Sequence, residues 1–265
     1  MRKIVFTLIV TMMFAFTFAQ IGTHIPENRL PQTEPAWWDA NESVLPWQNA
    51  GCLDLIRANG GLIIDKFIDV TQDLDNEEIE GYSFTDKIQN LVNNDPDDPY
   101  SNQSLLLYFP EGTYEFDETI TVNRDNVIFR GAGADKTTLL FTKEWGEDLD
   151  EQLLRYNLFE VEGSSYIGFE NMKLETVDST TINSSNNLSD YDGMYVKFIN
   201  SNYCWVAGVE MFKAQRHHIV INKSSHIEIR GCYFSKAHSY GGGGNGYGVQ
   251  LLDSLTTYCL IEDNI

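Results

Sequence analysis

The sequence predicts an all-β fold, a solenoid of short parallel strands. Five segments share one alternation of apolar positions, and their stacked columns hold similar residue types. A second short strand precedes each of the last four segments, and no convincing helical pattern lies between them. Short strands with regular turns are typical of a parallel β-solenoid. An antiparallel sandwich would show similar alternation, but aligned columns are not expected of hairpins.

The repeated segments span residues 126–133, 165–175, 202–212, 225–234 and 257–265. One apolar column holds Val127, Ile167, Cys204, Ile227 and Cys259, and the next holds Phe129, Phe169, Val206, Ile229 and Ile261. A third column holds the small or turn-permissive residues Gly131, Asn171, Gly208, Gly231 and Asp263. The intervals are 40, 37, 23 and 32 residues, so the longer ones should contain loops.

One helix is predicted upstream, within residues 83–93. Ser83 or Thr85 can serve as its N-cap, and Ile88, Leu91 and Val92 form its apolar face. Two strands around residues 110–112 follow the helix. A helix over the open end of a solenoid would satisfy an otherwise exposed strand edge. At the other end the chain stops inside a repeat, so we expect the solenoid to be incomplete at its C-terminus.

The N-terminal residues 1–19 have the pattern of a secretory signal peptide. Arg2 and Lys3 precede an apolar run, and Ala19 offers a small-residue cleavage site. We therefore expect an exported protein, extracellular or periplasmic, with an N-terminal extension and cap region at 20–80 and the solenoid at 81–265. No second apolar run follows, so membrane insertion is not expected, and the protein should be a monomer.

The net charge of −21 argues against nucleic acid as a partner, because an acidic protein repels the phosphate backbone. The charge is unevenly spread. Residues 190–265 carry six Lys/Arg against seven Asp/Glu, together with four of the five histidines. The later segment can therefore present a locally basic surface on an otherwise acidic chain.

The four cysteines of an exported chain invite two disulfides, but the columns argue against a Cys204–Cys259 bond. Ile227 lies between them, so their Cα atoms should be about 9.6 Å apart, at about 4.8 Å per coil. A disulfide tolerates at most about 7 Å. Cys232 belongs to another column. We expect these three cysteines to be unpaired core residues, and no spacing typical of a metal site is present.

The stretch "LLLYFPEGTYEFDETITV", followed by "NVIFRGAGADKTTLLF", resembles the start of the pectate-lyase-like superfamily of right-handed parallel β-helices. The F-P-x-G-T-Y and R-G-A-G segments carry the resemblance, which covers about residues 80–265. It implies a right-handed parallel β-helix with an N-terminal capping helix. The superfamily includes polysaccharide lyases, glycoside hydrolases, epimerases and phage tailspikes, so the resemblance alone does not define the reaction.

Outward side chains of successive coils form ladders on an extended face that suits a polymer. Counting back from the serines that end each strand places Val196, Phe198 and Ile219 inward. The same count puts Glu162, Lys197 and Gln250 in one outward ladder, and Glu160, Tyr195 and His218 in another. The candidate catalytic residues are therefore Tyr195, Lys197, Arg216 and His218, predicted to share one exposed patch. His217 should point inward and be structural.

These residue types suit β-elimination from an acidic, uronate-containing polysaccharide. Lys197 or His218 would remove the α-proton, Arg216 would neutralise the carboxylate, and Tyr195 would donate a proton. Hydrolysis of the polygalacturonase type needs paired carboxylates. By resemblance Asp192 matches one acid of that type, but Gln215 and Arg216 replace the expected Asp pair. A non-catalytic solenoid that binds glycans or serves adhesion is the third alternative.

Six glycines fall within residues 241–248, flanked by His238, Tyr240 and Tyr247. A strand, not a helix, follows them, so a phosphate-binding loop is not indicated. We expect a loop that faces substrate at the edge of the outward ladders, with Asp192, His238, Tyr240, Tyr247 and Gln250 as substrate-binding residues; a mere connection is the alternative. No cofactor is clearly indicated. The acidic stretches 93–100 and 144–152 are candidate Ca²⁺ ligands, although such runs are usually solvated loops.

Overall fold

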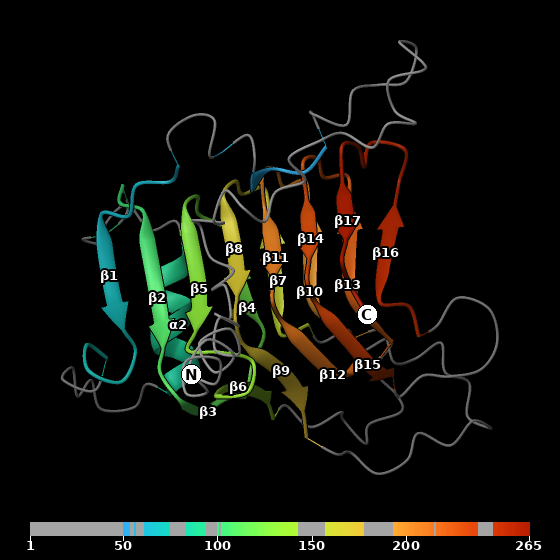
Figure 1. Ribbon diagram of the computed structural model, residues 1–265. Coiled ribbons are helices and arrows are strands. Elements are labelled where there is room, and N and C mark those ends of the chain that lie inside the picture. Colours follow the sequence, from blue (N-terminus) through green and yellow to red (C-terminus); the bar gives the residue numbers. More distant parts are fainter. Residues whose placement is uncertain are drawn as a thin grey trace, which may run out of the picture.

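The computed structural model describes residues 50–53, 56, 61–74, 83–93, 100, 102–142, 157–177, 193–214, 216–237 and 246–265. Within them the chain winds through three parallel sheets in turn, as Figure 1 shows. The expected signal peptide, Asp192, His238, Tyr240 and nearly all of the two acidic stretches lie outside the described residues.

Sheet A contains β1 (Lys66–Asp69), β2 (Leu105–Phe109), β5 (Val127–Gly131), β8 (Ile167–Glu170), β11 (Trp205–Ala207), β14 (Glu228–Arg230) and β17 (Leu260–Glu262). Sheet B contains β3 (Gly112–Phe116), β6 (Thr137–Phe141), β9 (Lys173–Thr176), β12 (Glu210–Ala214) and β15 (Tyr233–Ala237). Sheet C contains β4 (Ile120–Val122), β7 (Phe159–Glu162), β10 (Met194–Ile199), β13 (His217–Asn222) and β16 (Val249–Leu252). From β2 onward each strand pairs in parallel with the strand three places later, which confirms the predicted parallel β-helix.

The first two predicted columns are confirmed by the register of sheet A. Val127 is paired with Ile167, and Phe129 with Phe169. Val206 then pairs with Phe169 and Ile229, and Ile229 with Ile261. This register also places Cys204 beside Ile227 and Ile227 beside Cys259.

All four cysteines are free, as expected for the three that the columns place in the core. Cys204 and Cys232 are buried, and burial raises the pKa of each thiol to about 12. Cys259 is half-buried in the last coil.

The third column forms the bend from sheet A to sheet B. Asn171, Gly208, Gly231 and Asp263 all have φ between 54° and 63°. This is the left-handed region, which Gly, Asn and Asp enter at least cost. Gly131 differs: its φ is not positive, but a Cβ there would lie 2.4 Å from the Asn171 carbonyl oxygen. The column thus needs small residues for two reasons, conformation and close approach of the next coil.

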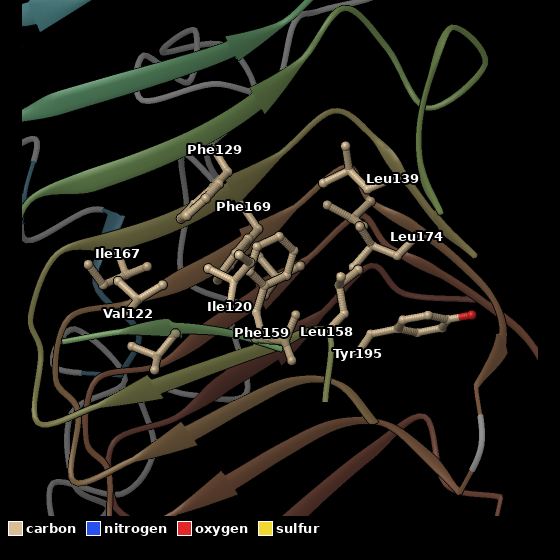
Figure 2. Packing of buried hydrophobic residues seen from close by; sticks show 14 of the residues in the cluster. Ile120, Val122, Phe129, Leu139, Leu158, Phe159, Ile167, Phe169, Leu174 and Tyr195 are labelled. Carbon is tan, nitrogen blue, oxygen red and sulfur yellow. The ribbon is translucent and has the colours of Figure 1, made fainter. Parts of the chain in front are cut away.

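The interior is filled by stacked aromatic and aliphatic side chains, which Figure 2 shows around Phe129 and Phe169. The rings of these two residues lie 5.0 Å apart and nearly parallel, and Phe159 lies 4.8 Å from Phe169. All three are fully buried. Each coil therefore buries its inward residues against those of the next, as in other solenoids.

Helix α2 (Phe84–Val92) closes the N-terminal end, as predicted. Ser83 is its N-cap, and Asp86 completes a capping box with it. The side chain of Gln89 donates to the Thr121 carbonyl and accepts from the Thr121 amide, each at 2.8 Å. Thr121 lies in β4, the first strand of sheet C, so this glutamine occupies the edge where an earlier strand would pair.

Sheet A begins with β1, inside the region that the sequence assigned to the N-terminal extension. Residues of the 50–64 segment then pack on the outer face of this sheet, where Cys52, Leu53 and Ile56 contact Leu106, Ile128 and Trp205. The indole of Trp205 lies over Gly168, where a Cβ would come within 2.3 Å of the ring. The middle of sheet A, around Leu106, Ile128 and Trp205, is therefore covered on both faces. No helix in the described part of the chain is long and apolar enough to cross a membrane.

Candidate functional site

The outer face of sheet C carries most of the residues that the sequence singled out. The register places Glu160, Lys197, Val220 and Gln250 in one column that crosses successive coils. Lys197 and Gln250 thus share an outward column, as predicted. The acidic member of that column is Glu160 rather than the expected Glu162, because β7 pairs with β10 in a register that puts Glu160 beside Lys197 and Glu162 beside Ile199.

Lys197 is not part of a purely basic patch. Its Nζ lies 3.3 Å from Oε2 of Glu160, and both side chains are about one-quarter exposed. The Asn157 side chain donates to the same carboxylate oxygen at 2.7 Å. The positive charge of Lys197 is therefore compensated locally, and the Glu160 carboxylate is held from two sides.

Tyr195 and His218 lie in neighbouring coils, but the prediction that they are exposed was wrong. They are only 1% and 3% exposed, and their rings lie 6.3 Å apart. The Tyr195 hydroxyl donates to the carbonyl of Phe212, which follows it in sheet B. Figure 2 shows the Tyr195 ring among the buried residues.

The reason lies at the bend from sheet B to sheet C. At the start of the sheet C strands Tyr195 lies in register with Leu158 and His218, and Leu158 and its neighbour Phe159 are both fully buried, so alternation does not hold there. The Tyr195 hydroxyl and Nε2 of His218 instead reach carbonyls of sheet B, those of Phe212 and Ser235. Burial raises the pKa of Tyr195 well above its usual value, so the phenol stays protonated. Neither Tyr195 nor His218 is placed to contact a polymer.

Arg216 immediately precedes β13 and is half-buried. Its amide donates to the Gly193 carbonyl at 3.0 Å, and its own carbonyl accepts from Gly246 at 2.8 Å. The neighbours of Arg216 in the adjacent coils therefore carry no side chain. His217, the next residue, is buried, as expected.

Tyr247 and Gln250 are the two predicted substrate-binding residues that fall within the described part of the chain. Tyr247 is 46% exposed and stacks on His217, with the ring centroids 5.2 Å apart. Gln250 is half-buried and pairs with Val220, which is only 1% exposed. Both lie on or beside sheet C, at the end of the glycine-rich segment.

Sequence reasoning did not single out Glu160 and Glu162 as a pair. They are two residues apart in β7, with Glu160 half-buried and Glu162 exposed, while the residues between and before them are buried. Strand geometry puts their Cα atoms about 6.6 Å apart on one face of the sheet. The alternation "FEVE" in the sequence already indicates that both glutamates lie on one face of the strand.

A buried ionic cluster on sheet A was also missed. Arg130 Nε lies 2.6 Å from Oε2 of Glu170. The other oxygen, Oε1, accepts from the Trp205 indole at 2.8 Å. Two coils on, Arg230 pairs with both Glu228 and Glu262. Burial raises the pKa of Glu170, against the opposing effect of Arg130. Glu228 also accepts from the amides of Cys52 and Leu53, a contact that sequence patterns could not predict.

Metal binding has no candidate in the part of the chain that is described. No group of three or more His, Cys, Asp or Glu side chains there could hold a metal ion. The acidic stretches proposed for Ca²⁺ fall almost entirely outside that part.

Stability should fall on acidification below about pH 6.5, in part through His218. Burial lowers the pKa of His218 in the folded protein, whereas the unfolded chain titrates near 6.5. Between these two values the unfolded state binds more protons, so the free energy of unfolding rises with pH by at most about 1.4 kcal/mol per unit. Urea unfolding at pH 7.5, 6.5 and 5.5 measures this slope.

The matched variant is His218→Gln, which lacks this titration and should show a shallower slope over the same range. The pKa of Glu170 is raised in the folded state, so its titration makes the free energy of unfolding fall as pH rises towards that pKa. This contribution is the same in both proteins and cancels in the difference. Parallel curves for the two proteins would contradict the assignment.

No protein-family model matches the sequence, and no characterised relative matches it either. Among solved structures, a protein from Parabacteroides merdae assigned provisionally to the glycosyl hydrolases is 16% identical, with a TM-score of 0.46; the match covers 76% of this chain and 97% of that one. A pectate lyase from Paenibacillus sp. 0602 is 10% identical (TM-score 0.38), with 56% and 36% covered. An iota-carrageenase complexed to iota-carrageenan fragments is 15% identical (TM-score 0.38), with 66% and 41% covered.

The chain thus spans well under half of the pectate lyase and the carrageenase. At these identities and TM-scores the likeness adds nothing about the site. The protein is a parallel β-helix by its own strand topology, with a charged outer face on sheet C.

Proposed function

We propose that this protein is an exported carbohydrate-active enzyme that binds a polysaccharide along the outer face of sheet C and hydrolyses it. The observation that carries the proposal is the outward pair Glu160 and Glu162, two residues apart in one strand. Inverting glycoside hydrolysis uses two carboxyl groups about 6.5–9.5 Å apart. The strand spacing of about 6.6 Å between their Cα atoms allows such a separation.

The surroundings suggest a role for each acid. Glu160 is bound by the Lys197 ammonium and by the Asn157 amide, which together fix the position of its carboxylate. It is therefore the candidate base that activates water. Glu162 is more exposed and would protonate the leaving oxygen. The outward column runs from Thr121 through Glu160 and Lys197, and then through the buried Val220 to Gln250, so a chain laid across the coils would meet a polar side chain on either side of Glu160.

β-Elimination from an acidic polysaccharide is the second candidate, and one observation favours it. Lys197 and Arg216 are both half-buried on or next to strands of sheet C, and two cationic side chains on one sheet suit a uronate carboxylate. However, Nζ of Lys197 is already paired with Oε2 of Glu160 at 3.3 Å. Tyr195 and His218, the other groups expected for elimination, are buried.

The test is cleavage of a panel of acidic and neutral polysaccharides, followed by two readouts. New reducing ends without absorbance near 235 nm indicate hydrolysis, whereas that absorbance indicates an unsaturated uronate formed by elimination. Glu160→Gln and Glu162→Gln should each lower kcat by at least about a hundredfold. Glu210→Gln, which changes a half-buried glutamate in β12 of sheet B, is the control and should retain activity.

Full activity in both variants would overturn the hydrolytic assignment. Retained binding without any product would instead favour a non-catalytic glycan-binding solenoid.

A further inference from the structure

The two oxygens of the Glu160 carboxylate have different surroundings. Nδ2 of Asn157 donates to Oε2 at 2.7 Å, and Nζ of Lys197 donates to the same oxygen at 3.3 Å. Within the part of the chain that the structure describes, no side chain or amide donates to the other oxygen, Oε1. Glu160 is half-buried on the outer face of sheet C. One oxygen is therefore bound twice, while the other remains available to a ligand on that face.

Asn157 is the buried member of this arrangement. It is 2% exposed and precedes β7 by one residue. Its Oδ1 accepts from the Met194 amide at 3.3 Å, and the amide of the next residue, Leu158, donates to the Met194 carbonyl at 3.1 Å. Because the oxygen of the Asn157 amide faces the backbone of β10, its nitrogen faces Glu160. The neighbouring coil thus determines the direction of this donor.

Lys197 reaches the same oxygen from the next coil. It pairs with Glu160 in the register of β7 and β10, and both side chains are about one-quarter exposed. A partly solvated ion pair of this kind contributes little to stability by itself. Together with Asn157, however, it binds Oε2 from two sides. The pair of donors therefore restricts rotation of the carboxylate more than either donor alone.

We propose that Asn157 and Lys197 are positioning residues that leave Oε1 of Glu160 as the atom that accepts the proton of the attacking water. The proposal rests on the proposed function, since it assigns roles within the same site. In that step the water oxygen bonds to the anomeric carbon while the glycosidic C–O bond breaks. One water proton passes to Oε1, and the leaving oxygen takes the proton of Glu162. A displacement of about 1 Å in such a group can cost about a hundredfold in rate.

Sheet B contains a matched ion pair. Nζ of Lys173 lies 2.7 Å from Oε2 of Glu175, and both side chains are 25% exposed, close to the exposure of Lys197 and Glu160. Lys173 and Glu175 both lie in β9, away from the outer face of sheet C. Lys173→Met therefore removes an equally exposed lysine–glutamate pair outside the proposed site. It is the control for Lys197→Met.

The experiment measures kcat and KM on a polysaccharide that the wild-type protein cleaves. Asn157→Ala and Lys197→Met should each lower kcat by at least about tenfold and leave KM within about twofold, because Oε2 does not bind the substrate. Their losses should not multiply in the double variant, since both changes affect one oxygen. Lys173→Met should keep kcat within about twofold. Urea unfolding checks that each variant is folded.

Asn157→Asp separates positioning from a merely structural role, and it decides the question together with Lys197→Met if Asn157→Ala does not fold. The change keeps an oxygen for the Met194 amide but places a carboxyl group against Glu160. When protonated, this group can still donate to Oε2, whereas its ionised form repels the carboxylate. The ratio of kcat in Asn157→Asp to kcat in the wild-type protein should therefore fall as pH rises. The neighbouring charges, Lys197 and Glu162, are the same in both proteins.

Undiminished kcat in Lys197→Met and in the Asn157 variants, or equal losses in Lys197→Met and Lys173→Met, would overturn the positioning roles but leave the hydrolytic function. A change confined to KM, or a kcat ratio for Asn157→Asp that is constant with pH, would also overturn them. If Glu160→Gln retained full activity, or if the wild-type protein cleaved no polysaccharide of the panel, both proposals would fall.

Discussion

Phe169→Ala should destabilise the protein by about 3–5 kcal/mol, the range for removing a fully buried aromatic ring. The Phe169 ring is fully buried and lies within 5.0 Å of both Phe129 and Phe159, with Phe198 at 6.3 Å. These contacts come from sheets A and C in adjacent coils, so the lost ring would leave a cavity that neither sheet can close. Urea unfolding measures the change as a lower midpoint at a constant slope.

Phe67→Ala is the control for this prediction. Phe67 lies in β1 of the same sheet, but it is 55% exposed, and its nearest ring partner is Tyr108 at 5.8 Å. Its removal should cost less than about 1 kcal/mol. Similar losses for Phe67→Ala and Phe169→Ala would show that the packed interior is not where the stability of this fold resides.

Glu228→Ala should cost about 3 kcal/mol and release Cys52 and Leu53 from sheet A. Oε2 of Glu228 accepts from the amides of Cys52 and Leu53 at 3.0 and 2.9 Å, and Oε1 lies 3.0 Å from the Arg230 guanidinium. Glu228 is 1% exposed, so removing it leaves two backbone donors and part of a guanidinium without their buried acceptor.

A local readout separates release of these two residues from general unfolding. Cys52 is 1% exposed in the native protein, and its thiol should become accessible to an alkylating reagent in Glu228→Ala before global unfolding. Peptide mass analysis identifies the modified cysteine. Glu210→Ala, a change on the outer face of sheet B, should leave Cys52 protected. Continued protection of Cys52 in Glu228→Ala would contradict the role of this carboxylate as an anchor.

Much of the fold could be predicted because its information is local. Apolar residues at every second position define a strand, and a left-handed residue such as Asn171 or Asp263 at its end defines a bend. Since each coil pairs with the next in register, similar residues recur in columns, and stacking the segments recovers the register of sheet A. The start of helix α2 could be predicted for the same reason, because Ser83 and Asp86 cap it within one turn.

The candidate site could be predicted only in part. Lys197 and Gln250 were placed on the correct face, since they lie inside strands where alternation holds. Tyr195 and His218 were wrongly expected to be exposed, because they lie in register with the buried Leu158 at the strand starts, where alternation does not hold. Lys197 and Glu160 are 37 residues apart, and the sequence-based count assigned Glu162 instead of Glu160 to the ladder of Lys197. Their pairing was therefore not predicted.

The sequence by itself determined the parallel solenoid, its columns and its capping helix, because these follow from short-range periodicity repeated along the chain. Only the tertiary structure decided which polar groups are buried and which charges meet. Glu228 anchors an amide 175 residues away, and the His218 ring lies between the carbonyl of Ser235 in β15 and that of Tyr247, two residues before β16. Such contacts depend on how the sheets meet at their corners and on which residues cover sheet A. Neither of these produces a periodic pattern in the amino-acid sequence.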